Sequence, residues 1–344
     1  MNQDKLKSLL QQVKYPGFSK DVVSFGLIQN VTESDGTIDL GVKFSTEKED
    51  VRQQILSDIE KVLREGGFEK INIEIIQAPV KPAVSEENAA PPSIPGIKHT
   101  IAVASGKGGV GKSTVAANLA TALRKQGHTV GILDLDVYGP SLPITMGVHE
   151  TPKVLEGNKL LPVSKYDMSL MSLGFLLNDS SPVIWRGAMV TKMVSQFLFD
   201  VSWGELDYLI LDLPPGTGDV QLTLVQQIAL TGAVIVTTPQ DLALKDVERG
   251  ANMFGKVNTP VLGIVENMSY HICSNCGHKS QIFSTGGGDK ESKRLDVPLL
   301  ARIPLNEEIM KAGEAGEPLV LFLPESEAAG IFRDLAAEVV KTTE

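Results

Sequence analysis

The stretch IAVASGKGGVGKST, residues 101–114, decides the fold class of this chain. A continuous apolar run leads into a glycine-rich loop, and TVAANLATALRKQG (114–127) then has the composition of a helix. Residues 106–113 fit the pattern G-x-x-x-x-G-K-[ST], in which glycines let the backbone curl and point successive N–H groups at phosphate oxygens. A strand, this loop and a helix in that order predict a nucleotide-phosphate site where the helix begins.

The remainder of the C-terminal part repeats the alternation of strand and helix. Apolar runs of strand length stand at 101–105, 130–136, 208–214, 233–239 and 261–268. These runs are continuous rather than alternating, which is typical of strands buried on both faces of a parallel sheet. The pattern predicts an α/β fold, a P-loop NTPase with a mostly parallel, doubly wound sheet and ligands at the carboxyl ends of the strands.

A proline-rich segment divides the chain. Residues 79–97 read PVKPAVSEENAAPPSIPGI, a composition that favours a semi-extended linker over a packed core. We therefore expect a small α+β domain at residues 1–78 and an ATPase domain at residues 98–344.

Within the small domain, two strand-like runs at 22–31 and 37–44 flank Asp35-Gly36. This dipeptide favours a hairpin turn.

Composition narrows the setting in which the protein works. The net charge of −10 disfavours nucleic acid and anionic lipid as partners. No apolar run reaches about 18 residues, the length that suggests a transmembrane helix, and the N-terminus has no apolar secretion signal. Only two cysteines occur, Cys273 and Cys276. We therefore expect a cytoplasmic protein in which this pair serves metal, cluster or redox chemistry.

The glycine-rich loop predicts specific contacts with ATP. Lys112 is expected to contact the β- and γ-phosphates, and the hydroxyl of Ser113 to bind Mg²⁺. Further contacts are expected from the loop backbone and the first helical turn, at Gly106, Lys107, Gly108, Gly109, Val110, Gly111 and Thr114.

Lys107 is not required by the general pattern. It marks the variant K-G-G-x-G-K-[ST], in which this lysine reaches across a dimer interface to the partner's nucleotide.

Three carboxylates follow the predicted strands. Asp134 and Asp136 end the second strand, and carboxylates so close to phosphate need a cation such as Mg²⁺. Asp136 is the candidate for positioning or activating the attacking water. Asp212 ends YLILD, a shape typical of the aspartate that holds Mg²⁺. Gly216, in the loop that follows, is a candidate for donating its N–H to a γ-phosphate, which would make this loop a nucleotide-sensing switch.

Two further features follow the fifth strand. The side-chain amide of Asn267 is suited to pairing with adenine, although a structural turn asparagine fits the sequence nearly as well. Cys273 and Cys276 form C-x-x-C, half of a tetrahedral sulfur site, which a two-fold dimer would complete with four thiolates for a 4Fe–4S cluster or zinc. His278 as a third ligand and a redox dithiol are competing interpretations.

Taken together, these motifs resemble the Mrp/ApbC-type iron–sulfur cluster carriers, within the deviant-Walker ATPases that include MinD and the nitrogenase iron protein. GKGGVGKST, DLDVYGPS, the run from Trp185 to Gly187, DLPPGTGD, TTPQDLAL, VENMS and C-x-x-C occur in the family's order. The sequence departs from the family at Ser274 and Ala188, where proline is common.

The resemblance implies a homodimer that bridges a labile 4Fe–4S cluster with Cys273 and Cys276 of both subunits. It also implies delivery of the cluster to apo iron–sulfur proteins, driven by ATP binding and slow hydrolysis. Lys107 would be the signature lysine and Asn267 an adenine contact. The N-terminal part looks like the small domain of iron–sulfur maturation proteins.

Two other functions remain open from the sequence. A MinD- or ParA-like positioning ATPase shares every nucleotide motif, but it favours a basic amphipathic tail, and the tail AAGIFRDLAAEVVKTTE is not basic. A zinc-stabilised structural dimer with a vestigial ATPase would use the same two cysteines.

Overall fold

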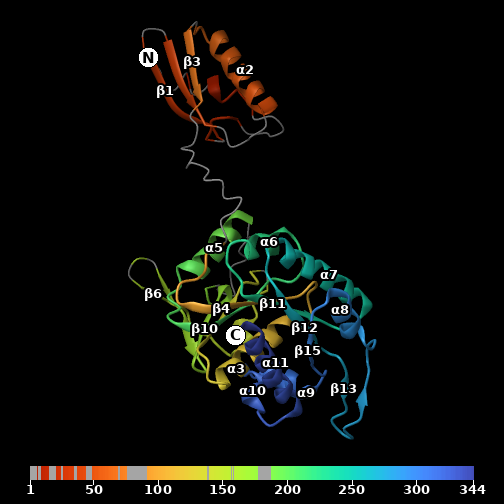
Figure 1. The fold of residues 1–344 in the computed structure, drawn as a ribbon. Coiled ribbons are helices and arrows are strands. Elements are labelled where there is room, and N and C mark those ends of the chain that lie inside the picture. The colour runs from red at the N-terminus through yellow and green to blue at the C-terminus, as the bar shows by residue number, and fades with distance from the viewer. Residues whose placement is uncertain are drawn as a thin grey trace. The chain divides into compact units, whose positions relative to one another are not determined.

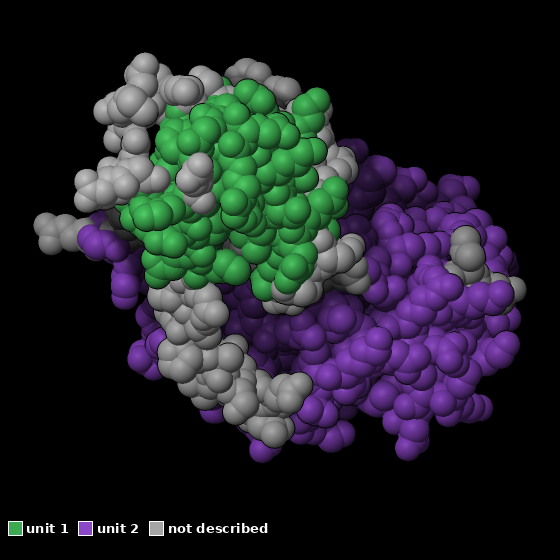
Figure 2. All heavy atoms as spheres, turned by 90° about the horizontal axis from the view of Figure 1, so that it is seen from above, with its two compact units in different colours: residues 1–89 green, residues 90–344 purple. Residues whose placement is uncertain are grey.

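The computed structural model describes the chain except residues 1–5, 7–8, 15–20, 25, 35–36, 44–48, 69, 76–90, 138, 156, 158 and 177–186. The chain divides into two compact units, residues 1–89 and 90–344, which Figure 2 shows in different colours. Each unit has a core of its own, so each is described by itself.

The first unit is a three-stranded sheet with a helix on one face (Figure 1). Its regular elements are β1 (Ile28–Ser34), β2 (Thr37–Val42), α2 (Glu49–Glu65) and β3 (Lys70–Ile75). Strand β2 is central, antiparallel to β1 and parallel to β3. Ile55, Ile59 and Leu63 recur every four residues along α2, so they share one face and are fully buried in the core.

The first strand of this unit is shorter than the sequence predicts. We expected a strand over 22–31, but β1 begins only at Ile28. The carboxylate of Asp21 accepts the backbone N–H groups of Val23 (3.0 Å) and Ser24 (2.8 Å), which turns the chain there. The expected Asp35-Gly36 turn lies outside the described residues.

The second unit is built on an eight-stranded sheet. Its order is β15-β12-β11-β4-β10-β5-β9-β8, and only the edge strand β8 runs antiparallel to its neighbour. The bounds are β4 (Ile97–Ala104), β5 (Val130–Asp134), β8 (Val163–Lys165), β9 (Met168–Ser172), β10 (Leu206–Asp212), β11 (Gly232–Thr237), β12 (Val261–Glu266) and β15 (Leu299–Arg302). Two small hairpins are formed by β6 (Lys153–Val154) with β7 (Leu160–Leu161) and by β13 (His271–Ile272) with β14 (Lys279–Ser280).

Helices cover both faces of this sheet (Figure 1). One core lies under α3 (Lys112–Lys125), α4 (Leu142–Thr145), α9 (Glu307–Glu314), α10 (Leu319–Phe322) and α11 (Glu327–Thr343). The other core lies under α5 (Gly187–Phe199), α6 (Asp219–Val225) and α7 (Asp241–Lys256), with α8 (Gly287–Leu295) beside them; a short 3-10 turn, η3 (Leu173–Phe175), follows β9. The predicted doubly wound α/β fold is thus confirmed, including the continuous burial of β5 and β11.

The strand order brings the polar loops together. Strand β4 lies between β11 and β10, and β5 lies on the far side of β10. Asp212, the last residue of β10, pairs in register with Val103 of β4 and with Asp134 of β5. Because neighbouring parallel strands end at the same sheet edge, the loops after these strands form one site. Among the described helices, none is both long and apolar enough to cross a bilayer.

Candidate functional site: a phosphate loop and a cysteine hairpin

The phosphate loop joins β4 to α3 and needs glycine for two separate reasons. Gly109 and Gly111 have φ values of 79° and 80°, a left-handed conformation that glycine adopts without strain. At Gly106 the reason is space, because a Cβ there would overlap the Cβ of Asp246 in α7. Backbone conformation and close packing together give the loop the curled shape that turns N–H groups toward a phosphate.

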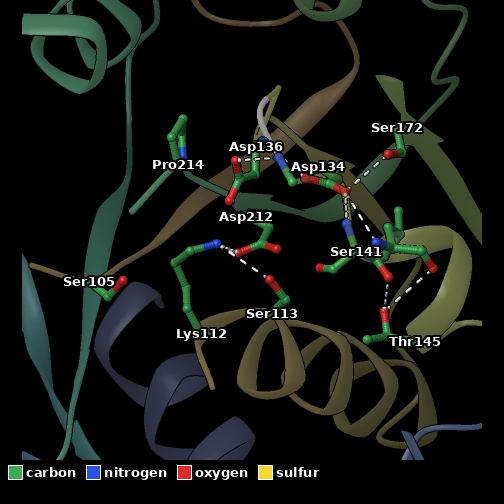
Figure 3. A network of polar contacts seen from close by, with 12 residues as sticks. Ser105, Lys112, Ser113, Asp134, Asp136, Ser141, Thr145, Ser172, Asp212 and Pro214 are labelled. Atoms are coloured by element: carbon green, nitrogen blue, oxygen red, sulfur yellow. Dashed lines mark hydrogen bonds and ion pairs between the residues drawn. The ribbon is translucent and has the colours of Figure 1, made fainter. Parts of the chain in front are cut away.

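Lys112 and Asp212 form a buried ion pair at the centre of the site (Figure 3). Lys112 is 6% exposed and Asp212 is 1% exposed. The Lys112 ammonium also lies 3.4 Å from the hydroxyl of Ser113. Burial raises the pKa of Asp212, while the Lys112 ammonium acts to lower it. A phosphate group that attracts Lys112 would therefore leave Asp212 in need of another cation.

Asp134 is buried and fully engaged in its own loop. It accepts hydrogen bonds from the backbone N–H groups of Asp136 (3.0 Å), Ser141 (3.1 Å) and Leu142 (3.1 Å) and from the hydroxyl of Ser172 (3.0 Å). Burial, followed by the negative charge of Asp212, raises the pKa of Asp134 to about 7. Asp134 thus organises the loop after β5, as a turn or helix-capping aspartate does, and its predicted contact with Mg²⁺ would have to compete with these four donors.

Asp136 extends from the same loop toward Asp212 (Figure 3), and its carboxylate accepts the N–H of Gly139 (3.2 Å). The negative charge of Asp136 adds to the upward shift of the Asp212 pKa, as expected for carboxylates that lie close together. The structure therefore brings the carboxylates of Asp134, Asp136 and Asp212 close to Lys112 and to the hydroxyl of Ser113. These carboxylates and this hydroxyl are a set of oxygen ligands that suits Mg²⁺.

Gly216 holds the loop after β10 against the phosphate loop. It has a φ of 103°, and its N–H donates to the carbonyl of Ser105 (2.9 Å). The predicted contact between this N–H and a γ-phosphate would replace that hydrogen bond. The Gly216 N–H thus has two alternative acceptors, the Ser105 carbonyl and the γ-phosphate.

Lys107 points to the neighbouring strand exit. Its ammonium donates to the side-chain oxygen of Gln240 (3.1 Å), the residue that precedes α7, and the hydroxyl of Thr238 donates to the same oxygen (3.3 Å). The predicted role across a dimer interface would require Lys107 to leave this amide.

Asn267 follows β12 and supports the phosphate loop. Its side-chain N–H donates to the carbonyl of Val110 (2.8 Å), and its side-chain oxygen accepts the N–H of Met268 (2.9 Å). Asn267 is 7% exposed and touches Gly111, where a Cβ would overlap the amide nitrogen. These two hydrogen bonds leave one N–H and one lone pair of the Asn267 amide for the predicted contact with adenine.

The two cysteines lie at the tip of the β13–β14 hairpin. The Cys273 N–H donates to the carbonyl of His278 (3.0 Å), and the Gly277 N–H donates to the carbonyl of Cys273 (2.9 Å). The N–H groups of Asn275 and Cys276 point at the Cys273 sulfur and lower the pKa of that thiol. Both thiols are free, and this turn stabilises the thiolate that binds metals.

His278 does not join the two thiols to make a three-ligand site. Across the part of the chain that the structure describes, no three His, Cys, Asp or Glu side chains lie close enough together to hold a metal ion. Within this chain, the hairpin offers a pair of sulfur ligands only.

Sequence reasoning missed three residues of the site. Gln240 and Asp246 lie in and just after the motif TTPQDLAL, which was the available signal, but their contacts with Lys107 and Gly106 were not foreseen. Gln221 is buried in α6 and its amide donates to the carbonyl of Pro214, which stiffens the loop that contains Gly216. Trp185 and Arg186, part of the family pattern, lie outside the described residues.

Comparison with known proteins identifies close relatives. A ParA family model, described as NUBPL iron-transfer P-loop NTPase, matches residues 96–340. Over 340 residues the chain is 42% identical to the iron-sulfur cluster carrier protein of Haemophilus influenzae, which covers 98% of this chain and 91% of that protein. Over 249 residues it is 51% identical to the carrier protein of Escherichia coli K12, covering 72% of this chain and 68% of that protein.

The solved structures that resemble this chain match its second unit. A nucleotide-binding protein from Archaeoglobus fulgidus in complex with ADP is 40% identical, with a TM-score of 0.58 over 67% of this chain and 94% of that one. MinD of Pyrococcus horikoshii, in complex with Mg-ADP, is 25% identical, with a TM-score of 0.53 over 71% of this chain and 96% of that one.

Proposed function

Because the chain belongs to the family of NUBPL-type iron-transfer P-loop NTPases, and is therefore a nucleotide-binding ATPase, we propose that it carries iron–sulfur clusters to apoproteins. The observation that carries this proposal is the pair of free thiols held in a thiolate-stabilising turn at one end of the ATPase unit.

ATP is bound by the phosphate loop. The backbone N–H groups of residues 106–111 and the start of α3 face the phosphates, because the glycines are curled and the helix dipole is positive at this end. Lys112 exchanges Asp212 for the β- and γ-phosphates, which carry more negative charge. Thr114, in the first turn of α3, and Asn267 contribute the remaining contacts with the nucleotide.

Mg²⁺ fits the oxygen donors beside Lys112. Ser113 and Asp212 would hold the ion, with Asp136 and Asp134 close by, and the release of Lys112 leaves the Asp212 carboxylate available for this. Bound there, Mg²⁺ neutralises the charge of the phosphates. Asp136 orients the attacking water and takes its proton, since its carboxylate extends from the loop after β5 toward Asp212 (Figure 3) and lies beside the oxygen donors that would hold Mg²⁺.

A homodimer completes both functions of the chain. Lys107 leaves Gln240 and reaches the nucleotide of the partner, and two cysteine hairpins together supply four thiolates for a 4Fe–4S cluster, the cargo. The clients are apo iron–sulfur proteins, and the reducing cytoplasm keeps both thiols available. ATP binding and hydrolysis change how firmly the two hairpins hold the cluster.

A positioning ATPase fits the structure less well. Phe332, Leu335 and Val339 on α11 are fully buried in the core that also contains α3, so the apolar face of this helix is already covered by protein. A membrane-binding tail would need that face free.

The test is anaerobic reconstitution with iron and sulfide, followed by metal analysis per subunit. Wild type is expected to bind about four iron atoms per dimer, which is one 4Fe–4S cluster. It is also expected to transfer this cluster to an apoprotein. The Cys273→Ser, Cys276→Ser variant should bind none, whereas His278→Ala should bind as wild type does. Unchanged cluster absorbance in the double variant, or zinc alone in anaerobically purified protein, would refute the carrier function.

A further inference from the structure

We propose that Asn267 is a positioning residue that couples occupancy of the phosphate loop to the geometry of the cysteine hairpin. The proposal rests on the proposed function only in taking the hairpin thiols as the working groups. It assigns Asn267 a task distinct from contact with the nucleotide base.

Asn267 joins the phosphate loop directly. Its amide N–H bonds to the carbonyl of Val110, and its nitrogen lies against Gly111, the residue that precedes α3. Val110 and Gly111 lie between the glycines and Lys112, the part of the loop that reorients when N–H groups and the ammonium turn to a phosphate. Because Asn267 is buried and touches this part, a shift of the loop displaces the Asn267 side chain.

The segment from Asn267 to Cys273 is held by hydrogen bonds along most of its length. Met268 lies in the left-handed region (φ 56°) and donates to the Asn267 side chain, which fixes the chain direction there. Ser269 donates to the carbonyl of Ile303 (2.9 Å), and the carbonyl of Tyr270 accepts from Leu305 (2.7 Å). Residues 271 and 272 then pair with β14. A displacement at Asn267 is therefore transmitted along a hydrogen-bonded segment of a few residues rather than absorbed by a loose loop.

The thiols at the far end respond to small changes of backbone geometry. The turn that carries them is held to the hairpin by two backbone hydrogen bonds, from the Cys273 N–H to His278 (3.0 Å) and from the Gly277 N–H to Cys273 (2.9 Å), so its geometry follows that of the hairpin strands. On the other side, an exposed ion pair of Lys279 with Glu327 (2.6 Å) ties β14 to α11, and the Ser274 hydroxyl makes a long contact with Glu307 of α9 (3.5 Å). Both attachments lie at the surface and are weaker than the backbone hydrogen bonds on the Asn267 side, so motion of the Asn267 side changes the orientation and exposure of the two thiols.

The experiment measures thiol alkylation in the full chain without cluster, with and without saturating ADP and Mg²⁺. Cys273 and Cys276 are the only cysteines of the sequence, so iodoacetamide reports on the hairpin alone. ADP is used because it fills the phosphate loop but lacks the γ-phosphate that would favour the proposed dimer. In wild type we expect ADP to change the alkylation rate about fivefold or more, the lower end of typical coupling between two sites.

Asn267→Ala, which loses the proposed nucleotide contact and is therefore assayed at an ADP concentration raised until its own binding saturates, should show a change of less than about twofold, since the coupling is lost. Asn118→Ala is the matched control. Asn118 is a buried asparagine of α3 with two hydrogen bonds, but these connect to Thr114 and Val320 rather than to the hairpin, so this variant should stay coupled. If the alanine variant does not fold, Asn267→Asp, which has the same shape but offers Val110 no N–H, replaces it.

The proposal would be overturned if ADP had no effect on the wild-type thiols, if the effect were undiminished in the Asn267 variant, or if Asn267→Ala and Asn118→Ala lost it equally. Failure of the Asn267 variant to bind ADP at any concentration would assign the residue to ligand binding and would also overturn it. None of these outcomes decides whether the hairpin carries a cluster, which the reconstitution of the cysteine variant tests separately.

Discussion

Replacing Lys112 by methionine should destabilise the protein more strongly as pH rises. Methionine keeps the apolar stem of the lysine but removes the ammonium that pairs with Asp212. Asp212 is 1% exposed, so the substitution leaves its carboxylate without a compensating charge in a buried site.

The size of the effect depends on whether Asp212 is ionised. Removing one partner of a buried pair costs about 3–5 kcal/mol while the other stays charged. Asp212 escapes this cost by taking up a proton, because its pKa is raised by burial and rises further once Lys112 is gone. At low pH Asp212 is neutral in both proteins and the difference is small. Between the two pKa values the folded variant holds a proton that wild type has lost, so the difference grows by up to about 1.4 kcal/mol per pH unit.

Urea unfolding at pH 5, 6, 7 and 8, followed by tryptophan fluorescence, measures this difference. Both tryptophans, Trp185 and Trp203, belong to the second unit, so the signal does not report on the first unit. The control is Lys341→Met, which breaks an exposed pair with Glu338 (3.5 Å) and should cost less than about 1 kcal/mol. An equal loss of stability for Lys112→Met at pH 5 and pH 8 would refute the reasoning.

Three further predictions follow from the site. Because the folded state keeps a proton on Asp134 up to a pH of about 7 that the unfolded chain loses near pH 4, the stability of wild type should fall as pH rises through this range; Asp134→Asn should flatten the slope in urea titrations. Gly111→Ala should cost about 1–3 kcal/mol more than Gly109→Ala, since both strain a positive φ but only at Gly111 does the Cβ overlap a neighbour, the amide nitrogen of the buried Asn267 side chain; equal midpoints in urea would contradict this. Peptide-level alkylation should show Cys273 ionising below the pH of a free cysteine, and Asn275→Pro, which removes the first N–H donor to the sulfur, should raise that pH; an unchanged profile would rule out this cause.

The sequence predicts those features of the fold that depend on residues close together in the chain. The phosphate loop is one, because its glycines, Lys112 and the flanking strand and helix are contiguous. The central strands are another, because burial on both faces requires continuous apolar runs. The edge strand β8 and its neighbour β9 were not predicted, since they are short and contain polar residues such as Ser164 and Ser169.

The contacts that give the site its shape depend on distant pairs. Gln240 meets Lys107 across 133 residues, and Asn267 meets Val110 across 157. No local pattern encodes which strands become neighbours. The sequence therefore predicts that Asn267 lies at a strand end, but not that its side chain bonds to Val110. The same holds for Asp134, whose burial among four donors follows from the loop it organises.

The position of α11 has a consequence for biosynthesis. Ala329, Phe332 and Leu335 of this helix are fully buried in the same core as α3, the helix that begins at Lys112. Among the described elements α11 is synthesised last, and until then the part of α3 that packs against α11, rather than against the sheet, faces water. A nascent chain that has not yet added α11 is therefore expected to hold α3, and with it the phosphate loop, less firmly than the folded protein does.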